Sequence, residues 1–144
     1  SKRGLSLAVM EFSTGGFLTN SITEVKESYS YFKGGIVATG PDSMIANGVP
    51  ARVLAKHGAV SQQTANAMAQ AARANMGADV GIGVSVSTEI EGRSMGLAYI
   101  SIANEHLLEE LEMQVPPNLV TIKRRISNQA LIKLRKLLEL ETRN

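Results

Sequence analysis

The chain has 144 residues, of which 44% are hydrophobic and 19% charged, and its net charge is only +2 although its sequence pI is near 9.0. This composition predicts a globular domain and excludes a disordered chain, and the small net charge argues against nucleic-acid binding by the domain as a whole. The absence of cysteine excludes disulfides, thiolate metal sites and a thiol nucleophile. No apolar run is long enough to span a membrane, and no signal-peptide pattern is present.

We predict one domain over residues 1–144 and, from the lack of cysteine, a cytoplasmic location. The chain opens on Ser1-Lys2-Arg3 without methionine, a start compatible with excision from a longer protein that also carries a partner domain or an N-terminal helix.

The first predicted elements enclose a glycine-rich turn. Residues 5–10 form an apolar run typical of a buried strand, and residues 15–24 are predicted to be helical. Between them lies Glu11-Phe12-Ser13-Thr14-Gly15-Gly16, which places backbone N–H groups at a helix N-terminus, where an anion or a polarised carbonyl can bind. Ser13 or Thr14 is either the N-cap of this helix, the commoner role, or a nucleophile.

The middle of the chain alternates further strands and helices. Pro41 suits the first position of a short helix, Ser61 is an N-cap, and Gly77 is a C-cap. Gly81 and Gly83 mark places where another backbone comes close to a strand. The predicted elements are a strand over 34–39, helical segments over 41–47, 50–56 and 62–76, a strand over 80–86, a hairpin of 96–102 with 107–114, and an amphipathic helix from about 118 to 140.

This order of elements predicts an α/β fold, namely a three-layer α/β/α domain with a mixed sheet. Outside the glycine-rich turn, the chemical signals are weak. His57 is assigned to a turn or cap, and His106 to a solvated hairpin without the converging ligands of a metal site. The basic residues of the last helix are assigned to a solvated face, with phosphate, nucleic acid or a partner subunit as the alternative. They are Lys123, Arg124, Arg125, Lys133, Arg135 and Lys136.

Four blocks of residues together resemble a known family. They are Glu11 with Thr14-Gly15-Gly16, then Phe32-Lys33-Gly34-Gly35-Ile36-Val37-Ala38, then His57-Gly58-Ala59-Val60-Ser61, and finally Ala78-Asp79. In this order and spacing they resemble the CinA C-terminal domain of competence/damage-inducible proteins, which includes the PncC-type nicotinamide mononucleotide amidases. The resemblance implies a three-layer α/β fold, no metal, and hydrolysis of the nicotinamide mononucleotide carboxamide by a serine that a lysine activates.

The catalytic positions of the family are not retained. The family serine falls on Phe12 and the family lysine on Met44, while the family tyrosine falls on Thr39. The glycine-rich loop of the family corresponds to a shorter segment, 85–92, in which Glu89 and Glu91 would repel a phosphate. The pocket at the family's active-site positions would be lined by Glu11, Phe12, Ser13, Thr14, Gly15, Gly16, Thr39, Met44 and Ser85.

The resemblance therefore indicates a catalytically degenerate member of the family, acting as a binding, oligomerisation or regulatory module. The alternative is an active amidohydrolase that releases ammonia from nicotinamide mononucleotide or a related amide, with Ser13 as a displaced nucleophile beside Thr14. We expect no cofactor, a nucleotide or small amide as a possible ligand, and a homo-oligomer. We expect neither a membrane nor a nucleic-acid partner.

Overall fold

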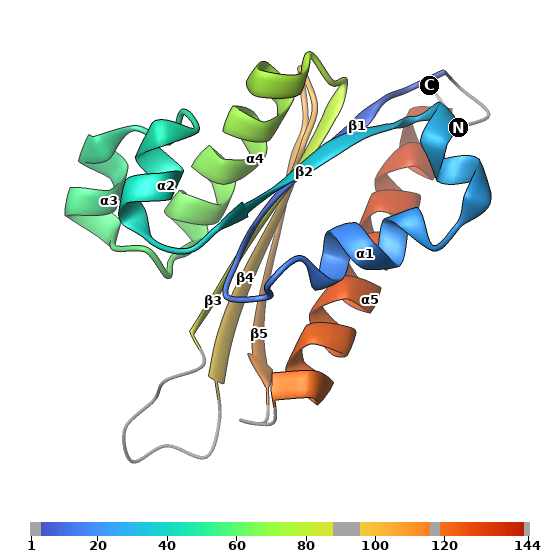
Figure 1. Ribbon diagram of the computed structural model, residues 1–144. Coiled ribbons are helices and arrows are strands. Elements are labelled where there is room, and N and C mark those ends of the chain that lie inside the picture. Colours follow the sequence, from blue (N-terminus) through green and yellow to red (C-terminus); the bar gives the residue numbers. More distant parts are fainter. Residues whose placement is uncertain (1–3, 88–95, 116–118, 143–144) are drawn as a thin grey trace.

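The computed structural model describes residues 4–87, 96–115 and 119–142, which form a five-stranded mixed sheet with helices on both faces (Figure 1). This architecture confirms the predicted α/β fold with its three layers. The elements are β1 (Leu7–Phe12), α1 (Phe17–Thr23), η1 (Lys26–Ser30), β2 (Phe32–Ala38), α2 (Pro41–Ala46), α3 (Ala51–His57), α4 (Gln62–Met76), β3 (Val80–Ser87), β4 (Gly96–Ala103), β5 (Leu108–Val115) and α5 (Leu119–Thr142).

The strands lie in the order β2-β1-β3-β4-β5, so β2 and β5 are the two edges of the sheet. β1 lies between β2 and β3 and pairs in parallel with both, whereas β4 and β5 join as antiparallel neighbours. Figure 1 shows α1 and α5 on one face of the sheet and α2, α3 and α4 on the other. Since side chains alternate along a strand, the two faces of the sheet pack into two separate cores.

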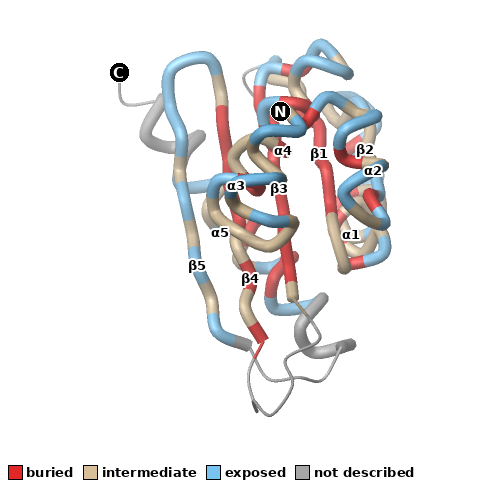
Figure 2. The backbone as a smooth tube through the Cα atoms, turned by 90° about the vertical axis from the view of Figure 1, so that its left-hand side faces the viewer, coloured by how far each residue is buried: buried red, intermediate tan, exposed pale blue. Residues whose placement is uncertain are grey.

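The core on the α5 side contains the longer aliphatic side chains, including Val9, Ile82, Ile100 and Ile126. The core on the α4 side is built from smaller side chains and methionines. Its buried members are Ala8, Met10, Ala38, Met44, Val49, Met68, Ala71, Ala72 and Ala78. Figure 2 shows that β1, β3 and β4 are buried along most of their length, whereas exposed segments are frequent along β5.

Close packing of α4 on β3 explains the two glycines of that strand. A Cβ on Gly81 would lie 2.0 Å from the backbone oxygen of Ala69, and a Cβ on Gly83 would lie 2.1 Å from that of Ala65. The prediction that another backbone approaches these glycines is confirmed, and the approaching backbone is that of α4. Ser61 caps α4 by accepting the N–H of Thr64 at 3.0 Å, also as predicted.

The predicted helices and strands all form, with ends that shift by one or two residues. In α5, Ile126 and Ala130 of the predicted apolar stripe are buried against the sheet, and Leu134 packs beside them. Arg124, Arg125, Arg135 and Lys136 are exposed, in agreement with a solvated basic face.

Candidate functional site

The glycine-rich turn lies at the C-terminal end of β1 and leads into α1. Ser13 has φ 68° there and is the one residue other than glycine, among those the structure describes, in the left-handed region. Gly15 (φ 62°) and Gly16 (φ 91°) share this sign, and glycine adopts it without steric cost. The turn thus holds one strained serine, a feature that is frequent at functional sites.

Glu11 supports this turn from the α1 side of the sheet. Its buried carboxylate accepts hydrogen bonds from the Thr14 hydroxyl at 2.6 Å and from the backbone N–H of Leu18 at 2.9 Å. It also accepts the N–H of Thr19 at 2.8 Å and the Thr19 hydroxyl at 2.5 Å. A negative charge at a helix N-terminus is favourable, so Glu11 itself occupies the position at which an anion would bind the end of α1.

The prediction that Ser13 or Thr14 is an N-cap is therefore wrong. The N-cap position belongs to Gly16, which has no side chain, and the amides of the first turn bond instead to Glu11. Thr14 does contribute, but as a donor to the same carboxylate. A carboxylate on the preceding strand can reach two amides at once, whereas a hydroxyl in the turn reaches one.

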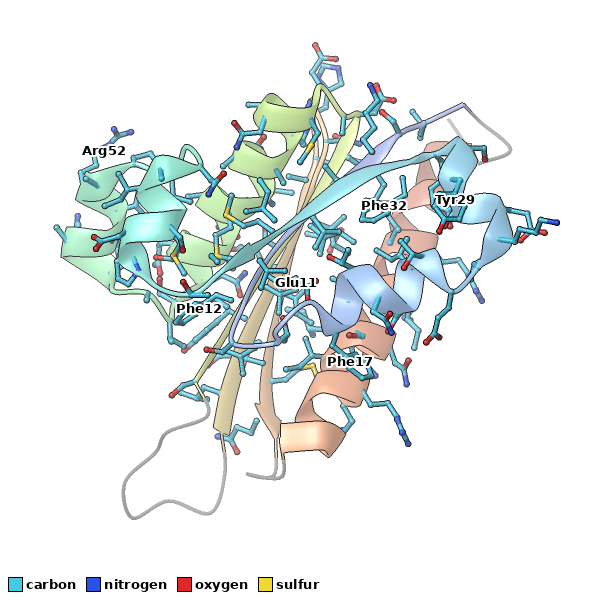
Figure 3. The ribbon with its side chains drawn as sticks, in the orientation of Figure 1. Glu11, Phe12, Phe17, Tyr29, Phe32 and Arg52 are labelled. Carbon is cyan, nitrogen blue, oxygen red and sulfur yellow. The ribbon has the colours of Figure 1, made fainter. Side chains whose placement is uncertain are left out.

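Phe12 points to the opposite face of the sheet from Glu11. Figure 3 shows Phe12 on the side of α2 and α3, and Glu11 on the side of α1. Phe12 is half-buried and packs against the α4-side core, to which the fully buried Met44 of α2 belongs. The structure thus brings Phe12 and Met44, which the resemblance aligns with the family's serine and lysine, into one apolar cluster.

A row of paired residues crosses the sheet at the level of Phe12. Phe12 pairs with Ala38 on one side and with Ser85 on the other, Ser85 pairs with Tyr99, and Tyr99 pairs with Glu112. Paired residues have their side chains on the same face of a sheet, so the row runs from an apolar half to a polar half. Sequence reasoning missed Tyr99 and Glu112, because only the register of four strands places them in one row with Phe12.

Hydrogen bonds hold the side chains of Ser85 and Tyr99, in the polar half of the row. The Ser85 hydroxyl donates to the backbone oxygen of Ala59 at 2.6 Å, which attaches the loop between α3 and α4 to β3. Burial raises the pKa of Tyr99 above 10.0, and the neighbouring, hydrogen-bonded Glu112 raises the same pKa further. Both hydroxyls therefore have protein partners.

The start of α2 is also held locally. The Ser43 hydroxyl accepts the N–H of Thr39 at 2.9 Å and that of Gly40 at 3.3 Å, while Thr39 itself is exposed. These bonds position α2 so that Met44 is directed into the core. The part of the predicted 85–92 loop that includes Glu89 and Glu91 lies outside the described residues.

The chemistry open to this site is limited by the side chains present. Among the residues that the structure describes, the Ser13 hydroxyl has no hydrogen-bond partner, and neither do the N–H groups of Gly15 and Gly16. Lys33 is not near enough to act on Ser13: it lies near the beginning of β1, at the opposite end from the turn, and donates to the oxygen of Gly77 at 3.2 Å. Within the described part of the chain, the arrangement offers amide donors and a hydroxyl that no base contacts.

Both histidines lie on other segments than this turn. His57 ends α3 and is half-buried. His106 is exposed in the turn between β4 and β5, with Nε2 3.7 Å from Glu105 Oε2. In the described ranges no three of the His, Asp and Glu side chains are arranged to hold a metal ion. None of the described helices is long and apolar enough to cross a membrane.

Comparison with known proteins identifies related sequences over almost the whole chain. Residues 1–138 match the family described as the CinA C-terminal domain. A CinA-like protein from Gemmatimonas aurantiaca is 32% identical over 139 residues, which are 93% of this chain and 32% of that protein. A relative from Caldicellulosiruptor bescii, named for competence-damage induction, is 37% identical over 140 residues, 94% of this chain and 34% of its own length. The chain thus spans about a third of the curated relatives it matches.

Solved structures with the same fold include the competence damage-inducible protein A from Klebsiella pneumoniae, with a TM-score of 0.87 and 24% identity. The match covers 96% of this chain and 89% of that one. A CinA superfamily protein from Escherichia coli matches with a TM-score of 0.86 and 21% identity, over 94% of this chain and 82% of the other. These likenesses establish the fold.

Proposed function

This chain belongs to the CinA C-terminal domain family, and on that basis we propose that it is a member without the family's amidase chemistry. Its role is then that of a binding, oligomerisation or regulatory module. The ligand class that fits the resemblance is a nucleotide or a small amide, bound without being hydrolysed.

One observation carries the proposal: Phe12 and Met44 occupy the matched serine and lysine positions, in a single apolar cluster. Amide hydrolysis of this type needs a nucleophilic oxygen and a group that removes its proton. A benzyl side chain and a thioether can do neither. Met44 is 0% exposed, so no solvent-borne base reaches this position either.

The test is ammonia release from nicotinamide mononucleotide by the natural protein and by a Phe12→Ser/Met44→Lys double variant. A silent natural protein supports the proposal, and ammonia release by the double variant would add that the pocket still holds the substrate. A lysine at position 44 would be buried, which lowers the pKa of an amine and suits it to act as a base. Circular dichroism would verify that the variant folds.

A matched control introduces the same two residue types elsewhere. Val25 and Tyr29 are both exposed, so Val25→Lys/Tyr29→Ser adds a lysine and a serine away from the turn. This control should stay silent. Turnover by the natural protein, at a rate that scales with protein concentration and survives repurification, would overturn the proposal.

The strained Ser13 supports a second candidate, an active amidohydrolase with Ser13 as nucleophile. The unpartnered amides of Gly15 and Gly16, among the residues described, would then stabilise the oxyanion. If the natural protein releases ammonia, Ser13→Ala should abolish the activity, and Ser43→Ala is the matched control at a hydroxyl already hydrogen-bonded to the backbone. Unchanged activity in Ser13→Ala would eliminate this candidate.

A further inference from the structure

The two edges of the sheet differ sharply in charge. β5 presents exposed carboxylates at Glu110 and Glu112, and charged side chains of this kind protect an edge strand from pairing with another copy. β2 carries a single charged residue, Lys33, and its second half is entirely uncharged. An uncharged edge strand is a template for pairing with a further strand.

The uncharged half of β2 is also apolar and accessible. Val37 is 45% exposed and Ile36 is half-buried, and Ile45, which follows in α2, is 43% exposed. Figure 1 shows β2 as an outer strand that runs from η1 at one end to α2 at the other. Its apolar side chains therefore lie along an open edge of the sheet.

We infer that β2 pairs antiparallel with β2 of a second copy of this chain, joining two sheets across a twofold axis near Ile36. This inference specifies the oligomerisation part of the proposed function. In this register Ile36 meets its own copy on the α4 side. Val37, which pairs with Glu11 and so lies on the α1 side, meets Gly35 of the partner subunit.

Charge complementarity selects the antiparallel arrangement and the second copy as the occupant. Exposed charges flank β2 with opposite signs, Lys33 near its beginning and Asp42 just after its end. Antiparallel self-pairing brings the Lys33 end of one copy to the Asp42 end of the other. Parallel pairing would place like charges together, and self-pairing of β5 would face Glu110 and Glu112 with further carboxylates.

Solution mass of the chain is the primary test. The expected result is a dimer of about twice the 15.4 kDa chain mass, by light scattering or sedimentation. Val37→Glu should convert it to a monomer. Leu108→Glu, at a β5 residue with a matching 46% exposure, should leave the dimer intact. Asp42→Lys should weaken the dimer roughly two- to fivefold, as expected for loss of an exposed ion pair.

A disulfide tests the register. The chain has no cysteine, so Ile36→Cys introduces the sole thiol. Opposite Cα atoms of an antiparallel pair lie about 4.5–5.5 Å apart, within the range that a disulfide spans. Mild oxidation should crosslink Ile36→Cys to a dimer, and Leu108→Cys should remain uncrosslinked.

A monomeric natural chain would overturn the inference and leave the β2 edge to another partner, such as a further domain of a longer protein. A dimer that persists in Val37→Glu but dissociates in Leu108→Glu would also overturn it, in favour of β5. These measurements do not depend on ammonia release. The pairing of β2 can therefore be disproved while the proposed lack of amidase activity stands, and the reverse.

Discussion

Thr19 donates both its backbone N–H and its hydroxyl to the same oxygen of Glu11, Oε2, at 2.8 and 2.5 Å. This double contact fixes the angle at which α1 leaves the turn after β1. It also brings the Thr19 side chain against β2, where a Cβ on Gly35 would lie 2.2 Å from the Thr19 hydroxyl. A single carboxylate thereby organises the junction of β1, α1 and β2.

Glu11→Gln should destabilise the fold by about 2 kcal/mol, the size expected when a charged hydrogen-bond acceptor is lost at a buried site. A glutamine amide NH₂ in place of one oxygen faces donors, either those of Thr19 or those of Thr14 and Leu18. Urea unfolding measures the difference.

Glu24→Gln is the matched control, because Glu24 is exposed and accepts only the Asn20 side chain, at 3.2 Å. It should change the free energy of unfolding by less than about 0.5 kcal/mol. Equal effects of the two substitutions would contradict the role assigned to Glu11.

Gly83→Ala should destabilise the protein by about 3 kcal/mol, because the new methyl group would overlap the backbone of α4 at Ala65, which cannot move aside as a side chain can. Gly40→Ala is the control: nothing lies within 4 Å of the position that its new methyl group would take, and its φ of 174° is extended. Thermal unfolding of both variants tests the packing. A Gly83→Ala protein as stable as Gly40→Ala would show that α4 does not contact β3 as described.

Asp79 should make stability depend on pH in the acid range. Hydrogen bonds from the Ser6 backbone N–H and hydroxyl lower the pKa of Asp79 below 3.8. The carboxylate therefore stabilises the fold above pH 3.8, and this contribution is lost as the pH falls through the lowered folded-state pKa.

Asp79→Asn should accordingly reduce the fall in urea midpoint between neutral and acid pH. Ser6→Ala removes one of the two donors, and should reduce that fall to a smaller extent. The idea fails if the natural protein and Asp79→Asn lose stability in parallel down to about pH 2.

Glu112→Gln should lower the pKa of Tyr99 toward 10.0, since burial and Glu112 raise it together and only burial remains. Because the pKa is raised on folding, the protonated Tyr99 side chain stabilises the folded state fully below pH 10.0. This contribution to the free energy of unfolding is lost as the pH rises through the folded-state pKa. Phenolate absorbance, with Tyr99→Phe to subtract the other tyrosines, reports the titration. Glu105→Gln, exposed in the β4–β5 turn, should leave it unchanged.

Local signals in the sequence were sufficient for the elements of the fold. Ser61 and Gly77 delimit α4 as predicted, because a cap acts over three or four residues and its partners are close in sequence. The cap of α1 was predicted wrongly, because the partner of the Leu18 and Thr19 amides is Glu11, which lies on the preceding strand and not in the turn. The distance in sequence is short, but the turn geometry decides which side chain reaches the helix.

The sequence by itself determined the α/β fold and the family, because these depend on residue types and their spacing. The same spacing predicts that Phe12 and Met44 stand at the family's serine and lysine positions. Only the tertiary structure decided that Phe12 and Met44 join one apolar core while Glu11 turns to the other face. It alone set Tyr99 and Glu112 in line with Phe12. The physical reason is that strand register and helix docking arise from contacts between segments far apart in the chain, which no local pattern encodes.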